Sequence, residues 1–157
     1  MIIYHGAKQE IAKPDIFHSL AKLDFGKGFY TTTLLSQAEQ WVEHFLRNQQ
    51  QGIINFYTLD DSVWTEAKVL IFDTYSDNWL DLITKCRRGF DTSDYDLIVG
   101  GVANDKIFNT CELYFKKYID KETALRRLRY ENPNQQICFK NQEILDRYLL
   151  FERSEQR

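Results

Sequence analysis

Segments that favour strands and segments that favour helices are interspersed along this chain without a regular alternation. This order is the feature that most constrains the fold, because a doubly wound parallel sheet requires strands and helices to alternate regularly. It therefore predicts an α+β fold with a mixed or antiparallel sheet and flanking helices. The length of 157 residues fits one domain, which we place at residues 1–152, with residues 153–157 as a frayed polar tail.

Runs of β-branched and aromatic residues predict the strands, and apolar residues at helical spacing predict the helices. The first helix is expected to begin with a capping box of Ser36 and Glu39, to present Trp41 on an apolar face and to end at Gly52. Strands are expected at residues 2–5, 29–33, 53–59, 68–72, 94–99, 136–139 and 148–151. Further helices are expected at residues 76–87, 106–118 and 121–130, with a helical turn at 141–147.

Charge and composition exclude several classes of protein. The net charge of −3 indicates no general attraction to nucleic acid or to acidic membranes. No apolar run is long enough to span a bilayer, and the first ten residues do not fit a signal peptide. The three cysteines are far apart and form no C-x-x-C pair, which favours reduced thiols in a cytoplasmic protein over a zinc ribbon or a redox motif. The three histidines lack metal-ligand spacing, so no metal site is expected. The motifs of a phosphate loop, a Rossmann site and a serine-nucleophile elbow are absent from the sequence.

Three segments combine polar or aromatic side chains with flexible backbone or a strand edge. The first is Tyr4-His5-Gly6, which offers an imidazole next to a backbone that a ligand can approach closely. Taken alone, a histidine satisfied by a local hydrogen bond explains this segment better.

The second segment, residues 24–33, places Gly26 and Gly28 in a tight loop before an aromatic strand. Trp41 follows Tyr30 by eleven residues, on the next helix. One aromatic ring from the strand and one from the helix could hold a flat ligand between them. Taken alone, the helical phase of Trp41 favours a residue of the core.

The third segment is residues 134–139, a short strand that begins at Gln135 or Gln136. The two side chains point to opposite faces of a strand, so only one of them can face a site. Gln136 is the residue that faces the site if the apolar residues of the strand follow it directly, and Gln135 is that residue if one residue intervenes. We favour Gln136.

Together these segments resemble the ADP-ribosyltransferase family in its His-Tyr-Glu branch, the type of diphtheria toxin and the poly(ADP-ribose) polymerases. The resemblance implies that His5 binds a ribose of NAD, that the Gly6 backbone holds the carboxamide and that Tyr30 stacks on nicotinamide. Trp41 matches a second aromatic residue of the diphtheria-toxin group. The motif around Tyr30 adds Gly28, Phe29 and Thr31 as NAD-binding positions.

The chain departs from this family at the position of the catalytic glutamate. There it has a glutamine, Gln136 or, in the alternative alignment, Gln135. A neutral amide cannot stabilise a developing cation as a carboxylate can, but it can orient the ribose. Asp105 is the best candidate for a carboxylate that contributes instead. Arg87 and Asn104 are expected to flank the site, with surface or turn positions as the alternative.

A closer resemblance, to an uncharacterised bacterial domain family within this superfamily, covers nearly the whole chain. It includes Trp79-Leu80 with Arg87, and residues 96–105, where Gly101 replaces an expected proline. Genes of that family often adjoin small partner genes.

The resemblance implies a single domain with a split sheet. It also implies a mono-ADP-ribosyltransferase toxin that uses NAD as substrate, modifies protein, DNA or RNA, and has a small antitoxin partner. The alternatives are a catalytically inactive module that binds NAD, ADP-ribose or a protein, and an NAD glycohydrolase.

Overall fold

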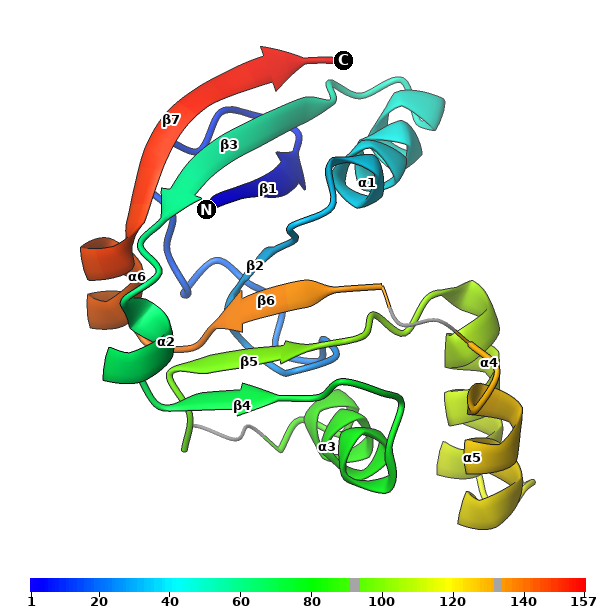
Figure 1. Ribbon diagram of the computed structural model, residues 1–157. Helices are drawn as coiled ribbons and strands as arrows, with labels where there is room; N and C mark the ends of the chain where they lie inside the picture. The colour runs from blue at the N-terminus through cyan, green and yellow to red at the C-terminus, as the bar shows by residue number, and fades with distance from the viewer. Residues whose placement is uncertain (91–93, 132–133) are drawn as a thin grey trace.

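The strands of this protein form two separate sheets, as Figure 1 shows for the computed structural model, which describes residues 1–90, 94–131 and 134–157. The first sheet is antiparallel and has the order β1-β3-β7, formed by Ile2–Ala7, Ile53–Leu59 and Leu149–Gln156. The second sheet has the order β2-β6-β5-β4, formed by Phe29–Thr31, Gln136–Phe139, Leu97–Gly100 and Val69–Ile71.

Only the β4–β5 pair of the second sheet is parallel among the described strands, and its other pairs are antiparallel. The expected α+β fold with a split, mixed or antiparallel sheet is therefore confirmed. An isolated bridge between Tyr4 and Thr32 connects β1 of the first sheet to the chain that leaves β2. The two sheets thus meet at the first two of the three segments identified in the sequence. We call Tyr4-His5-Gly6, residues 24–33 and residues 134–139 the first, second and third motifs.

The helices lie around the two sheets (Figure 1). Helix α1 lies beside the first sheet, α3 lies against the second, and α4 and α5 lie together at the end of the molecule where β5 finishes. The short helices α2 and α6 lie at the opposite end. The bounds of α1 to α6 are Leu35–Arg47, Val63–Glu66, Asp77–Arg87, Asp105–Phe115, Lys121–Leu128 and Gln142–Tyr148.

The expected capping box at the start of α1 is wrong. The helix begins at Leu35, and the side chain of its N-cap residue, Leu34, makes no capping hydrogen bond. The Thr32 hydroxyl instead accepts a hydrogen bond from the Leu34 N–H at 3.0 Å. Ser36 lies within the first turn because the helix starts directly after the bridge between Thr32 and β1.

The polar end of the chain is not frayed, contrary to expectation. Residues up to Gln156 belong to β7, and the register pairs Gln156 with Ile53 of β3. The guanidinium of Arg153 lies 3.9 Å from the centre of the Phe56 ring, which covers apolar surface of the sheet. A polar sequence is compatible with an edge strand, because its backbone pairs while one of its faces meets water.

Two core clusters lie on opposite faces of β6. Ile137 and Phe139 belong to the cluster that joins the two sheets, whereas Cys138 belongs to the cluster formed with α3, α4 and α5. Side chains alternate along a strand, so Gln136 lies on the same face as Cys138. The strand thereby directs Gln136 towards the helices and away from the packing between the sheets.

A fully buried asparagine on β3 holds the irregular segment that follows β1. Asn55 is 0% exposed, and its side chain accepts a hydrogen bond from the Ile11 N–H and donates to the carbonyls of His5 and Gln9. These bonds keep the backbone after the His5 motif against the first sheet.

We predict that Asn55→Ala lowers the free energy of unfolding by about 1–3 kcal/mol, because it removes three hydrogen bonds from a fully buried side chain to partly buried backbone groups. Denaturant unfolding followed by circular dichroism measures this change. Asn109→Ala is the control, because Asn109 is exposed on α4 and its substitution should change stability by no more than about 0.5 kcal/mol. Equal effects of the two substitutions would contradict the prediction.

Candidate functional site

The first two motifs are joined through the imidazole of His5. Its Nδ1 lies 2.6 Å from the carbonyl oxygen of Tyr30, and its ring stacks on Phe29 with 4.6 Å between the ring centres. Burial lowers the pKa of His5, and the hydrogen bond to Tyr30 only partly opposes this shift. A neutral imidazole whose Nδ1–H donates to a carbonyl has a lone pair on Nε2. His5 can therefore accept a hydrogen bond from a hydroxyl group at Nε2.

Tyr30 closes the loop that precedes it. Its hydroxyl donates to the Gly26 carbonyl at 2.5 Å and accepts from the Phe25 N–H at 3.1 Å. Burial raises the pKa of Tyr30, with a further contribution from Cys138, so the hydroxyl stays protonated. Gly26 has φ 74°, a backbone conformation that glycine adopts without strain. The loop is thus held in one shape, while Tyr30 as a whole residue is partly exposed.

Trp41 is 59% exposed on α1, so its interpretation as a residue of the core is wrong. It lies beside the first motif, since a Cβ atom built on Gly6 would be 3.2 Å from Trp41 Cδ1 and 3.0 Å from the Ala38 carbonyl oxygen. Gly6 therefore allows β1 and α1 to approach closely. Among the described residues, the ring contacts of Trp41 are with His44 and Phe45 of its own helix, and no contact between Trp41 and Tyr30 is formed.

The other residues of the second motif pack β2 in place. A Cβ atom on Gly28 would lie 2.5 Å from both Cys138 Sγ and the Phe139 carbonyl oxygen. Phe29 is buried between His5 and Tyr57. The Thr31 side chain is buried and donates to the Ile137 carbonyl at 3.3 Å. Contacts with neighbouring strands therefore explain why glycine, phenylalanine and threonine occupy positions 28, 29 and 31.

Gln136, not Gln135, lies in the polar centre of the site. Gln135 is exposed and accepts a hydrogen bond from the Thr33 hydroxyl. Gln136 is buried, and its Nε2 donates to Asp24 Oδ2 and to the Gly101 carbonyl, both at 3.2 Å. Because both partners are acceptors, they determine which end of the amide is nitrogen. The Oε1 atom has no hydrogen-bond partner within the described part of the chain.

Asp24 is the residue that sequence reasoning missed. Its carboxylate is buried, forms an ion pair with Arg87 through Oδ1, and accepts from the Ala103 N–H at 2.9 Å and from Gln136 through Oδ2. The guanidinium of Arg87 also lies 4.4 Å from the centre of the Phe108 ring. In the sequence, the feature that could have identified Asp24 as a site residue is its position at the start of the loop of residues 24–28, which we call the glycine loop.

Asp105 and Asn104 lie outside this hydrogen-bond network. Asn104 Oδ1 accepts from the Ile107 N–H at 3.1 Å and so caps α4, the role that favours asparagine at this position. Asp105 is the first residue of that helix and is exposed. The carboxylate hydrogen-bonded to Gln136 is that of Asp24, so the structure does not join Asp105 to Gln136 as expected.

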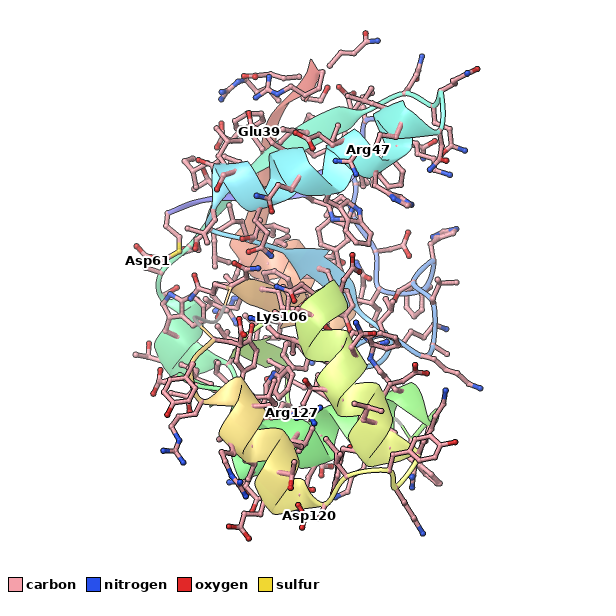
Figure 2. All side chains as sticks on the ribbon, turned by 90° about the vertical axis from the view of Figure 1, so that its right-hand side faces the viewer. Glu39, Arg47, Asp61, Lys106, Asp120 and Arg127 are labelled. Carbon is pink, nitrogen blue, oxygen red and sulfur yellow. The ribbon has the colours of Figure 1, made fainter. Side chains whose placement is uncertain are left out.

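Two surface cavities lie away from the motif residues. A cavity of about 460 Å³ lies between residues 74–77 and α5, and one of about 340 Å³ lies between α4 and α5, where Figure 2 labels Lys106 and Arg127. Neither cavity is lined by His5, Tyr30, Trp41 or Gln136. Within the described residues, no group of three or more His, Cys, Asp or Glu side chains is arranged to hold a metal ion. No helix in the same residues is long and apolar enough to cross a membrane.

We predict that Gly28→Ala lowers the free energy of unfolding by about 1–3 kcal/mol, because the new methyl group overlaps the β6 backbone. Lys27→Ala, an exposed change in the same loop, should alter stability by no more than about 0.5 kcal/mol. Chemical denaturation of both variants measures the difference. Wild-type stability of Gly28→Ala would show that β2 and β6 are not this close.

We predict a loss of stability at mildly acidic pH that depends on His5. The pKa of His5 is lowered in the folded state, so below its ordinary value of 6.5 the unfolded chain takes up the proton first. His5 therefore contributes full stability above pH 6.5 and loses it as the pH falls towards its lowered value. The slope of unfolding free energy against pH should flatten in His5→Gln and persist in the exposed-site variant His44→Gln. Equal slopes in wild type and His5→Gln would refute this assignment.

Comparison with known proteins identifies a family but no characterised relative. No curated protein and no solved structure matches this chain significantly. Residues 1–151 match the family described as "Protein of unknown function (DUF3990)". Because this match spans nearly the whole length, the chain belongs to the DUF3990 family.

Proposed function

We propose that this protein cleaves the bond between nicotinamide and ribose in NAD and transfers ADP-ribose to a macromolecule. One observation carries the proposal: the loop of residues 24–30 connects the first and third motifs. At its end, the Tyr30 carbonyl accepts from His5, and at its start, the Asp24 carboxylate accepts from Gln136. His5, Tyr30 and Gln136 are therefore linked through this loop in one hydrogen-bonded region, although they are far apart in the sequence.

Each of these groups has the chemistry that its assigned part requires. His5 Nε2 and Gln136 Oε1 are acceptors that suit ribose hydroxyl groups. Tyr30, which is partly exposed, and Trp41, which is exposed, supply aromatic side chains for nicotinamide or adenine. Gly6 allows β1 and α1 to approach closely, which places Trp41 beside the first motif.

The reaction needs little acid–base assistance at the leaving group. Nicotinamide in NAD is a cationic pyridinium, and it leaves with the electron pair of the bond to ribose, which neutralises its charge. The ribose carbon develops positive charge, and a nucleophile of the acceptor attacks it and releases a proton. An acceptor oriented towards the ribose hydroxyl would hold the sugar in the reactive geometry. The resemblance further supports a bacterial toxin that acts in the cytoplasm and pairs with a small antitoxin.

A second candidate function is a module that binds NAD or ADP-ribose without cleaving it. The observation that favours it is the engagement of both Gln136 amide protons by Asp24 and Gly101, which gives Gln136 a structural role. An NAD glycohydrolase, with water as the acceptor, is a third outcome of the same experiment.

The test uses purified protein with NAD labelled in the adenylate part and a bacterial lysate, with protease-treated and nuclease-treated samples alongside. Label that protease removes indicates transfer to protein, and label that nuclease removes indicates transfer to nucleic acid. Free ADP-ribose with nicotinamide, without labelled macromolecule, indicates a glycohydrolase. Binding of NAD without release of nicotinamide indicates the binding module, and no binding would refute all three functions.

We predict that Trp41→Ala weakens NAD binding about tenfold without loss of stability, since stacking of a base on an aromatic side chain contributes ~1–3 kcal/mol. The side chain is exposed, so the variant should fold as the wild type does. Isothermal titration with NAD measures the affinity. Tyr118→Ala is the control because Tyr118 is 75% exposed and lies outside the site. Unchanged affinity in Trp41→Ala would remove this residue from the proposed site.

A further inference from the structure

Asp24 brings a buried negative charge next to Gln136. Asp24 is 7% exposed, and a buried carboxylate requires a paired cation or several hydrogen-bond donors. Arg87 supplies the cation at Oδ1, and the Ala103 N–H and Gln136 donate to Oδ2. The oxygen that meets Gln136 is thus not the one that meets Arg87.

This arrangement also determines the direction of the Gln136 amide. Its nitrogen is held by Asp24 Oδ2 and by the Gly101 carbonyl, which also accepts from Trp79 Nε1 at 3.1 Å. The amide oxygen is at the other end of the group. A hydrogen bond from an amide N–H to a carboxylate polarises the amide and increases the negative charge on its oxygen.

We propose that Asp24 is a positioning residue for Gln136 and that, through the amide, it supplies the negative charge that a glutamate at position 136 would supply directly. This inference rests on the proposed function. In this arrangement, Gln136 Oε1 accepts from a ribose hydroxyl, while Asp24 both orients the amide and increases the charge on that oxygen. In this site the carboxylate belongs to residue 24, whereas in the resembled family it belongs to the residue at the place of Gln136.

Because the carboxylate is at position 24, a second carboxylate at position 136 should be unfavourable. Gln136→Glu restores the residue typical of the resembled family, yet it would place a second carboxylate about where Nε2 now lies, 3.2 Å from Asp24 Oδ2. An ionised glutamate also has no proton to donate to Asp24 or to the Gly101 carbonyl. Two carboxylates this close disfavour their shared ionisation. Asp24→Asn in the same chain would relieve the repulsion, because the asparagine side chain can donate to the introduced glutamate while one negative charge remains for Arg87.

The experiment measures nicotinamide release from NAD by the full chain with D24N, Q136E and the D24N/Q136E double variant. We expect each single variant to lower kcat ~10-fold or more while KM changes less than about twofold, and the double variant to regain ~10-fold over the slower single variant, a coupling in the range found for contacting residues. Thermal unfolding of each variant sets a temperature at which all are folded. D61N is the control and should keep the wild-type kcat, because Asp61 is exposed, at the position labelled in Figure 2.

The possible outcomes separate this inference from the proposed function. If the wild type releases no nicotinamide, the proposed function and the inference both fail. If the wild type is active and D24N keeps its kcat, the inference alone fails. A role of Asp24 in folding alone would lower stability and leave kcat of the folded D24N protein unchanged, and it would not produce rescue by the double variant. If D24N does not fold, Q136E decides: release as fast as wild type or faster overturns the inference, and release ~10-fold slower supports it.

Discussion

The buried carboxylate of Asp24 is the interaction on which the arrangement of the site depends. It connects the glycine loop to Arg87 at the end of α3, to the Ala103 backbone before α4, and to Gln136 at the start of β6. Without the carboxylate, the Arg87 guanidinium, the Ala103 N–H and the Gln136 amide would each lose a hydrogen-bond partner. Polar groups that lose their partners in buried or partly buried positions are costly. One side chain therefore holds together four segments that come from different parts of the chain.

A second constraint is the close approach of β2 to its neighbours. Gly28 leaves no Cβ atom between the start of β2 and the β6 backbone, and the bridge between Tyr4 and Thr32 brings β1 to the other end of β2. His5 then reaches the Tyr30 carbonyl and stacks on Phe29. The junction of the two sheets is thus also the place where the first two motifs meet.

The aromatic residues of the site differ in how far they are committed to packing. The hydroxyl of Tyr30 is engaged by the loop that precedes it, and its ring contacts the core cluster of the second sheet. Trp41 has most of its surface in solvent, although exposure of an indole is unfavourable. The indole lies beside Gly6 of the adjoining strand and leaves an aromatic face open to solvent. The rings of Tyr30 and Trp41 form no contact with each other within the described structure.

The sequence by itself determined the strands and most helices, since alternation and helical spacing depend on residues that are neighbours in the chain. It also identified His5, Tyr30, Trp41 and Gln136 as residues worth locating. Only the tertiary structure showed that Asp24 is the carboxylate beside Gln136, that Asp105 is not, and that the polar end pairs with β3. The physical reason is that the stability of a buried charge, or of an edge strand, depends on partners brought close by folding, and the separation of those partners along the chain carries no local signal.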